Sequence, residues 1–301
     1  MNLLTLLAGS KYFNGKVGDA SRIKLIRHSS PDDFDVERRF KYDSPYLEAF
    51  QAVQSTDLLK GCDVVLSFLR DQGQRAVFRG AWEVKGRITR EQYLARYKSG
   101  KEVMAVEDTF NSSRQTKTRF DQSFYDTSSI DLLGDIADRL VIDWGKSAIS
   151  WCQWLSEKEV IEILPANYVS EFPGHYDLIL TLHELRQMIS NPASNRTWHQ
   201  QLSSVSAVYL ILDTTTGKQY VGSAYGKDGL WGRWATYTTD PSGGNKLLLE
   251  LLKENGKKHA EKFQFSILRV LERSVTREQV IRSEQVEKLK LGTRAFGLTL
   301  N

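Results

Sequence analysis

The chain has 301 residues, of which 41% are hydrophobic and 26% are charged. This composition is typical of a globular protein and excludes a chain that is disordered throughout. No run of about 18 apolar residues occurs, so neither a transmembrane helix nor a membrane partner is expected. The two cysteines are too few for a disulfide framework or a cysteine-based zinc site, and they favour a reducing, cytoplasmic location.

Positive charge is concentrated in the last third of the chain. The whole chain holds 41 basic and 37 acidic residues, whereas residues 203–301 hold 15 basic and 10 acidic ones. The first 202 residues therefore hold 26 and 27. A basic domain beside a nearly neutral one favours nucleic acid as the partner, because the phosphate backbone attracts positive charge. Lysines scattered at random over a solvated surface would give the same numbers.

The first two thirds of the chain predict a mixed α/β domain over residues 1–190. Apolar residues at helical spacing predict a helix over 46–59. Two runs of period two flank the turn Asp71-Gln72-Gly73-Gln74 and predict a β-hairpin with strands at 63–69 and 75–84. The remaining predictions are a helix at 89–97, a loop at 106–131, strands at 140–145 and 160–165, and an amphipathic helix at 178–189.

A second domain is predicted over residues 204–301. Residues 191–203 begin with the helix stop signal Asn191-Pro192 and are interpreted as a linker. The pattern beyond the linker predicts a β-β-α-α-β-α order. The predicted strands cover 207–212, 219–223 and 263–271, and the predicted helices cover 230–237, 245–253 and 276–289.

Side chains capable of chemistry recur in a distinctive order within this second domain. One tyrosine lies in each of the first two predicted strands, and a glycine follows the second tyrosine. An arginine and a tyrosine then lie four residues apart, on one face of a helix, and a glutamate lies in the last helix. These residues are Tyr209, Tyr220, Gly222, Arg233, Tyr237 and Glu284.

In this order, Val208-Tyr209-Leu210 and Tyr220-Val221-Gly222 resemble the signature of the GIY-YIG nuclease family. The resemblance covers residues 204–301. It implies an α+β fold with a small antiparallel three-stranded sheet flanked by helices. It also implies an endonuclease that hydrolyses DNA phosphodiester bonds with one Mg²⁺ or Mn²⁺ ion. Because one such site cuts one strand, a double-strand break would require a homodimer or two successive cuts.

The resemblance implies a role for each of these side chains. Glu284 would hold the metal, and Arg233 would donate to a non-bridging phosphate oxygen. Tyr220 would be the general base for the attacking water; since a free phenol titrates near about 10, it needs a nearby cation for this. Tyr209 would orient Tyr220, and Tyr237 would contact phosphate or brace Arg233.

Further residues of this domain are expected to contact DNA. Gly222 would let the backbone approach the scissile group closely. The family pattern ends in an asparagine, which corresponds to Asn301 here. Two residues depart from the pattern: Ser223 stands where several family members have a lysine, and Thr299 stands where an asparagine is expected. The expected DNA contacts are Gly222, Ser223, Lys288, Lys290 and Asn301.

Each of these side chains also has an ordinary structural explanation. A tyrosine in a half-buried strand commonly packs against the neighbouring strand. Glu284 and Lys288 have the spacing of a solvated i,i+4 pair on a helix. Arg233 would equally suit a surface ion pair, and Tyr237 would suit a core. A catalytically silent nucleic-acid-binding protein and an RNA-directed nuclease therefore stay as alternatives.

The hairpin at 63–84 resembles part of a small β-barrel of the PUA or EVE type. Such a barrel implies a domain that reads an extruded base between aromatic side chains. A base reader joined to a nuclease implies selection of the target, as in modification-dependent restriction or defence. The candidate stacking residues are Trp82, Trp144, Trp151 and Trp154. The alternative is that these tryptophans fill a core.

Overall fold

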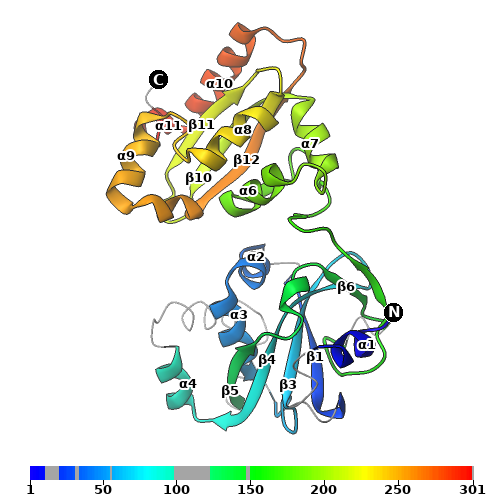
Figure 1. Ribbon diagram of the computed structural model, residues 1–301. Coiled ribbons are helices and arrows are strands. Elements are labelled where there is room, and N and C mark those ends of the chain that lie inside the picture. Colours follow the sequence, from blue (N-terminus) through cyan, green and yellow to red (C-terminus); the bar gives the residue numbers. More distant parts are fainter. Residues whose placement is uncertain (11–19, 31–33, 55, 98–122, 147–149, 300–301) are drawn as a thin grey trace. The chain divides into compact units, whose positions relative to one another are not determined.

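A computed structural model describes residues 1–10, 20–30, 34–54, 56–97, 123–146 and 150–299. The chain forms two compact units, unit 1 (Met1–Leu164) and unit 2 (Pro165–Asn301) (Figure 1). The division therefore lies earlier than expected, and residues 191–203 are not a linker. Most of that segment is a helix whose Trp198 and Leu202 are buried in the core of unit 2.

Unit 1 is built on one curled, half-barrel sheet with helices on both of its faces (Figure 1). The strands are β1 (Ile23–His28), β2 (Val53–Gln54), β3 (Val64–Arg70), β4 (Arg75–Ile88), β5 (Ser123–Ile130), β6 (Leu140–Asp143), β7 (Cys152–Trp154) and β8 (Val160–Ile163). The helices are α1 (Leu3–Ala8), α2 (Phe34–Tyr42), α3 (Ser44–Gln51) and α4 (Arg90–Arg96), with short 3₁₀ turns η1 (Ala20–Arg22) and η2 (Gly134–Ile136).

The length of β4 gives this sheet its curl. Strand β4 has 14 residues and pairs with the predicted hairpin partner β3, which confirms the hairpin. Its first residues also pair with β6, whereas residues from Ala81 onward pair with β5. Because the partner on that edge changes along β4, and because β-bulges interrupt both long pairings, the sheet bends instead of staying flat. A closed barrel of the PUA type stays a prediction.

Two sequence predictions for unit 1 were wrong. The helix expected over 46–59 ends at Gln51, because Val53 and Gln54 pair with β5. The end of the expected loop at 106–131 is strand β5, and the earlier part of that range lies outside the described residues. Strand β5 was not predicted, because its inward positions include Ser123 and Thr127. Its buried face is partly polar, so the sequence shows no apolar alternation there.

Unit 2 contains an antiparallel sheet with the strand order β11-β10-β12-β9. Its strands are β9 (Ile179–Thr181), β10 (Ser206–Asp213), β11 (Gln219–Ala224) and β12 (Phe263–Leu271). Its helices are α6 (Leu182–Ser190), α7 (Arg196–Ser203), α8 (Gly229–Thr239), α9 (Lys246–Asn255), α10 (Arg277–Leu291) and α11 (Thr293–Phe296), with the 3₁₀ turn η3 (Lys257–Lys262).

The expected three-stranded sheet of unit 2 is corrected to four strands among the described residues. The fourth strand, β9, pairs with β12 in residues that were predicted to begin a helix. Thr181 forms a capping box with Glu184 and so fixes the start of α6. The residues before this cap are extended, which lets them add to the edge of β12.

The two faces of the unit 2 sheet have different neighbours. Successive side chains of a strand point to opposite faces. Tyr209 and Ile211 of β10 point into the apolar core formed with α6, α7, α8 and α9; we call this side the core face. Ser223 of β11 and Arg269 of β12 instead bond to side chains of α10, on the side that we call the α10 face.

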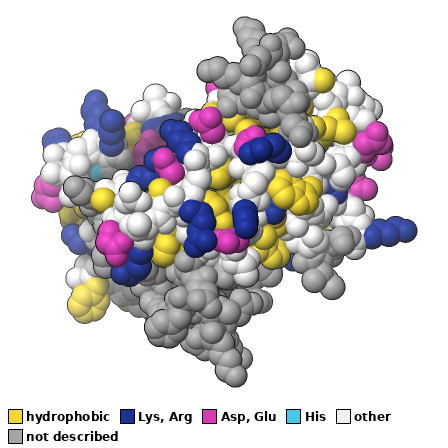
Figure 2. Space-filling model, turned by 90° about the horizontal axis from the view of Figure 1, so that it is seen from below, with side chains coloured by type: hydrophobic (Ala, Val, Ile, Leu, Met, Phe, Trp, Pro, Cys, Tyr) yellow, Lys and Arg dark blue, Asp and Glu magenta, His cyan; other side chains and the backbone are white. Residues whose placement is uncertain are grey.

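None of the helices in the described ranges combines the length and the apolar character needed to cross a bilayer. On the face of the molecule in Figure 2, Lys and Arg side chains lie among acidic and hydrophobic ones.

His28, at the end of β1, is a buried titratable group in unit 1. Its ring packs against Phe40 at 5.1 Å between ring centroids, and its Nε2 has no hydrogen-bond partner among the described residues. Burial lowers the pKa of His28 to about 4, although the Gln51 side chain acts in the opposite direction. The folded protein therefore holds this imidazole neutral at neutral pH.

We expect unit 1 to lose stability as the pH falls from about 6.5 toward about 4. In that window the unfolded chain binds a proton at His28 and the folded chain does not, so a lower pH favours unfolding. The loss is on the order of 3 kcal/mol. Hydrogen exchange of β1 and β3 peptides at neutral and mildly acidic pH measures it. The His28→Gln chain should lose less stability than the wild type over this range, and equal losses would contradict the prediction.

Candidate active site

A guanidinium and two phenols from separate elements meet on the core face of unit 2. The hydroxyls of Tyr209, in β10, and Tyr237, in α8, lie 2.9 Å apart. Arg233 lies one turn before Tyr237 and donates Nε to the Tyr209 hydroxyl at 2.9 Å and Nη2 to the Tyr237 hydroxyl at 3.2 Å. Nη2 also donates to the Gly243 carbonyl at 3.2 Å. These bonds fix the position and the plane of the guanidinium; we call Tyr209, Arg233 and Tyr237 the Tyr–Arg cluster.

The two phenols of the cluster are neutral positioning groups. Tyr209 and Tyr237 are fully buried. Burial raises the pKa of both phenols well above the ordinary range. Neither phenol is therefore suited to accept a proton near neutral pH, which agrees with an orienting role for Tyr209.

Arg233 has no acidic partner in the described part of the chain. No carboxylate oxygen lies within 4.0 Å of its guanidinium nitrogens there, and Nη1 makes no hydrogen bond. Arg186 of α6, by contrast, forms an ion pair with Glu261. The described hydrogen-bond acceptors of this half-buried guanidinium are neutral, so it keeps its full charge. The Ser242 hydrogen bonds, together with that charge, lower the pKa of Asp240. Its Nη1 edge is left to bind an anion from outside the chain.

Two glycines make room for the Tyr–Arg cluster. Gly222 pairs directly with Tyr209 across the strands, and a Cβ there would lie 2.5 Å from the Tyr209 hydroxyl and 2.9 Å from Cε1 of Tyr220. Gly243 has a φ of +53°, and a Cβ there would overlap the Tyr237 ring. The sequence did not predict that Gly243 belongs to this site, although the Gly243-Gly244 pair is a turn signal.

Tyr220 lies beside the cluster on the same face of the sheet. It comes two residues before Gly222 in β11, and its ring centroid lies 6.4 Å from that of Tyr209. It is only partly buried, and its hydroxyl makes no hydrogen bond to the described residues. That hydroxyl is therefore available to an external group, while its role as a base stays a prediction.

Glu284 lies on the α10 face. Ser223, the residue after Gly222, donates its hydroxyl to Oε2 of Glu284. Nζ of Lys288 lies 2.5 Å from Oε1 of the same carboxylate. The side chains of Glu284 and Lys288 are only 16% and 7% exposed. We call Ser223, Glu284 and Lys288 the carboxylate cluster.

The structure thus brings the predicted catalytic residues into two groups. Tyr209, Arg233 and Tyr237 contact one another, with Tyr220 next to them. Glu284 is connected to them through adjacent residues of β11, Gly222 and Ser223. No hydrogen bond or ion pair joins Glu284 to the Tyr–Arg cluster within the described ranges. Their convergence on one phosphate stays a prediction.

The residues expected to contact DNA differ in their surroundings. Lys288 is buried and paired with Glu284, so it is not an exposed backbone contact, whereas Lys290 is 58% exposed and pairs with Glu287. Thr299 accepts a hydrogen bond from the Val221 amide at 3.4 Å and so covers part of the β11 edge. Asn301 lies outside the described residues.

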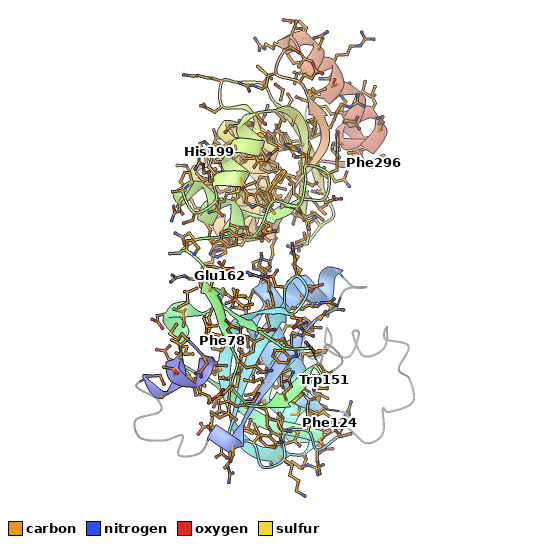
Figure 3. All side chains as sticks on the ribbon, turned by 90° about the vertical axis from the view of Figure 1, so that its right-hand side faces the viewer. Phe78, Phe124, Trp151, Glu162, His199 and Phe296 are labelled. Atoms are coloured by element: carbon orange, nitrogen blue, oxygen red, sulfur yellow. The ribbon has the colours of Figure 1, made fainter. Side chains whose placement is uncertain are left out.

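The four tryptophans of unit 1 also separate into two pairs. Trp144 is fully buried and donates Nε1 to the Ser150 carbonyl at 2.9 Å, and Trp82 is 4% exposed. These two fill the core, which corrects the expectation that they stack on a base. Trp151, labelled in Figure 3, is 46% exposed and Trp154 is 45% exposed. Nζ of Lys24 lies 4.2 Å from the centre of the Trp154 ring.

The donor atoms of the carboxylate cluster suit a hard divalent cation. Mg²⁺ is commonly held by one or two carboxylates and completes its coordination with phosphate oxygens and water. Glu284 supplies one such carboxylate, and the Ser223 hydroxyl lies beside it. The described residues contain no group of three or more His, Cys, Asp or Glu side chains that could hold a metal without the substrate. A metal at Glu284 would therefore depend on phosphate oxygens.

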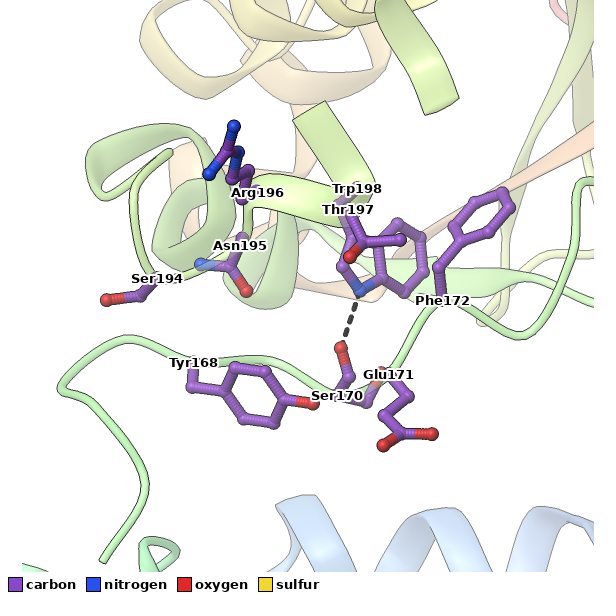
Figure 4. A pocket seen from close by; sticks show the side chains of 9 residues that line it. All are labelled: Tyr168, Ser170, Glu171, Phe172, Ser194, Asn195, Arg196, Thr197 and Trp198. Atoms are coloured by element: carbon purple, nitrogen blue, oxygen red, sulfur yellow. Dashed lines mark hydrogen bonds between the residues drawn. The ribbon is translucent and has the colours of Figure 1, made fainter. Parts of the chain in front are cut away.

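A cavity in unit 2 lies among other residues. Its volume is about 350 Å³, and the segment before α6 and the start of α7 line it (Figure 4). Polar groups around it already hold this segment in place: Trp198 donates Nε1 to the Ser170 carbonyl at 2.7 Å, and Asn195 accepts from the Val169 amide at 3.0 Å. None of the predicted site residues lines it.

Comparisons with known proteins leave the family open. No protein family matches the sequence, and no curated protein matches it. Among solved structures, the chain is similar to the catalytic domain of the intron endonuclease I-TevI, with 23% identity and a TM-score of 0.27. The match covers 32% of this chain and 94% of that domain. A similarity of this size does not establish a shared fold, and the candidate site rests on its own geometry.

We expect Gly222→Ala to destabilise unit 2 by about 1–3 kcal/mol, because the new methyl group must displace the Tyr209 phenol or the backbone of β11. Denaturant unfolding measures this. Gly226→Ala is the matched control, since a Cβ at Gly226 meets nothing within 4 Å. Similar stabilities of the two variants would show that the Tyr–Arg cluster can move aside without cost.

Proposed function

We propose that unit 2 is a nuclease that hydrolyses phosphodiester bonds in DNA, and that Arg233 binds the scissile phosphate. The observation that carries this proposal is the guanidinium held by two neutral phenols with no acidic partner among the described residues. Phosphate and carboxylate are the anions that such a fixed donor binds, and the predicted nucleic-acid partner makes phosphate the choice here. The order of the tyrosines, the arginine and the glutamate in the sequence supports the same reaction.

Arg233 would act on the charge that develops during the reaction. Its free Nη1 edge would donate to a non-bridging phosphate oxygen, whose negative charge grows as water attacks. The bonds from Tyr209, Tyr237 and the Gly243 carbonyl already hold the guanidinium in place. The site would therefore not have to reorganise to stabilise the transition state, which is why fixed donors contribute strongly to catalysis.

Tyr220, after losing its own proton to solvent, would accept a proton from the attacking water as a phenolate. It is the phenol of this group whose hydroxyl is left without a hydrogen bond to described residues, whereas Tyr209 and Tyr237 bond to each other and to Arg233. Gly222, between Tyr220 and Ser223, would let the phosphate approach the backbone. These roles agree with those that the sequence predicts.

Glu284 would hold Mg²⁺ or Mn²⁺ together with phosphate oxygens. When bound, such an ion would stabilise negative charge on the leaving 3′ oxygen. Since Glu284 and Arg233 lie on opposite faces of β11, a nucleic-acid strand that touches both would cross the edge of that strand. Two subunits, or two successive events, would cut both strands of a duplex.

Unit 1 would select the target. Exposed indole rings stack on bases regardless of sequence. Trp151 and Trp154 supply such rings, and the buried Lys24, which donates to the Leu58 carbonyl, lies over the Trp154 ring and supports it. Recognition of modified DNA in restriction or defence is the use that a reader joined to a nuclease suggests, and comparing cleavage of plain DNA and DNA with modified cytosine tests it.

We expect Arg233→Ala to lower the rate of DNA cleavage about 10²- to 10³-fold, because it removes the fixed donor to the phosphate. Cleavage of a labelled duplex in Mg²⁺ measures this. Arg186→Ala is the control: it removes a guanidinium from the same unit, but one that already has an acidic partner in Glu261. If Arg233→Ala cuts as fast as wild type, Arg233 does not bind the reacting phosphate.

The same assay separates the alternative functions. Cleavage of RNA but not DNA would indicate an RNA-directed nuclease. Binding of both without cleavage, unchanged by Glu284→Gln, would indicate a catalytically silent binding protein.

We expect Trp154→Ala to weaken nucleic-acid binding by about 1–3 kcal/mol, the usual contribution of one base stacked on an aromatic ring. Fluorescence anisotropy with a labelled single strand measures the affinity. Ile161→Ala is the control, because Ile161 is an exposed apolar residue of the same unit without an aromatic ring. Equal affinities of the two variants would exclude stacking on Trp154.

A further inference from the structure

The carboxylate cluster already contains a cation. Lys288 follows Glu284 by one helical turn, and its Nζ lies 2.5 Å from Oε1, while the Ser223 hydroxyl bonds to Oε2. We propose that Lys288 competes with a divalent metal for Glu284 and moves to a phosphate when DNA binds. Metal and DNA would then bind cooperatively. This inference rests on the proposed function of Glu284 as the metal ligand.

The pair differs from the other ion pairs of its helix and its unit. Lys290 pairs with Glu287 at 3.1 Å with its side chain 58% exposed, and Lys246 pairs with Glu250 at 4.0 Å with its side chain 74% exposed. Exposed pairs of this kind are weak, because water and salt screen them. The Lys288 side chain is 7% exposed, so its attraction to Glu284 is screened much less.

A metal ion and the Lys288 ammonium cannot both contact Oε1 of Glu284. A divalent ion on Oε1 would stand next to the ammonium, and like charges at that separation repel strongly where water is partly excluded. The entry of a metal therefore requires Nζ to leave Oε1. An ammonium that leaves a carboxylate at a buried site is stabilised by a new anion nearby. The phosphate backbone supplies that anion, and the flexible lysine stem allows the movement.

The consequence is a coupling between two ligands. Without DNA, a metal at Glu284 must overcome the loss of the Lys288 pair, so its affinity is low. With DNA, the phosphate accepts Lys288, and the metal gains the full carboxylate. Linkage requires the reverse as well: the metal must raise the affinity for DNA by the same factor.

Mn²⁺ titration by calorimetry, with the full chain and no nucleic acid, tests the competition. Lys288→Met keeps the apolar stem of the side chain and removes the charge. We expect it to bind Mn²⁺ at least about tenfold more tightly than wild type, whereas Lys290→Met, the matched control two residues away, should bind like wild type. Adding Glu284→Gln to Lys288→Met should remove the gain. If Lys288→Met binds Mn²⁺ no more tightly than wild type, the inference is wrong.

A second measurement does not depend on the folding of Lys288→Met. The affinity of the Tyr220→Phe chain for a labelled duplex is measured by anisotropy with and without Mn²⁺; under the proposed function this chain binds DNA but does not cut it. Mn²⁺ should raise the affinity at least about tenfold, and a smaller rise in the chain that also carries Lys288→Arg would identify Lys288 as the coupling residue. No effect of Mn²⁺ on DNA affinity would overturn the proposal.

These results are independent of turnover. If the Mn²⁺ affinities follow the expected order but the wild-type chain cuts no nucleic acid, the competition stands and the proposed hydrolysis fails. If the chain cuts DNA in the presence of a chelator and binds no Mn²⁺, the hydrolysis stands and the competition fails.

Discussion

The site in unit 2 depends on how a guanidinium without a direct ion-pair partner among the described residues is held at the edge of an apolar core. Burial of Arg233 is tolerated because three neutral oxygens accept its hydrogen bonds. That arrangement dictates much of the surrounding sequence. Gly222 must lack a side chain for the Tyr209 phenol to lie over the strand, and Gly243 must adopt a positive φ beside the Tyr237 ring. The register of β10 on β11 and the docking of α8 on the sheet thereby become parts of the one arrangement that holds the guanidinium.

On the α10 face of β11, a mostly buried carboxylate is paired with a cation. Glu284 is neutralised in place by Lys288 and bonded by Ser223, so α10 is held to β11 without an outside ligand. Arg269 of β12 makes a second bond to this helix through Glu287 at 2.7 Å. Among the described residues, Arg233 therefore has no carboxylate within 4.0 Å, whereas Glu284 has an ion pair with Lys288. Adjacent residues of one strand, Gly222 and Ser223, connect the two.

The sequence predicted the regular elements of unit 2 better than the contacts of its site. Strong period-two and helical patterns located β10, β11, β12, α8 and α10 close to their observed bounds. The short strand β9 and the polar helix α7 escaped because neither has a long apolar pattern; tertiary packing of Trp198 and Leu202 fixes α7. The burial of Lys288 could not be predicted from the sequence, since an i,i+4 pair has the same spacing whether it is solvated or buried. In unit 1, the pattern predicted the β3–β4 hairpin, but not the curl imposed by pairing along the whole of β4.

The contrast between the two charged groups implies an order of binding. If Arg233 binds the phosphate as proposed, nothing has to be displaced there, so the phosphate would bind first. Its negative charge would then offer the Lys288 ammonium another partner. Oε1 of Glu284 would thereby become more available to a metal. An ion that arrives before the phosphate meets a neutral ion pair, and one that arrives after it meets a carboxylate and phosphate oxygens together, which is the set of ligands that Mg²⁺ prefers. The lysine would thus tie metal binding to the presence of substrate.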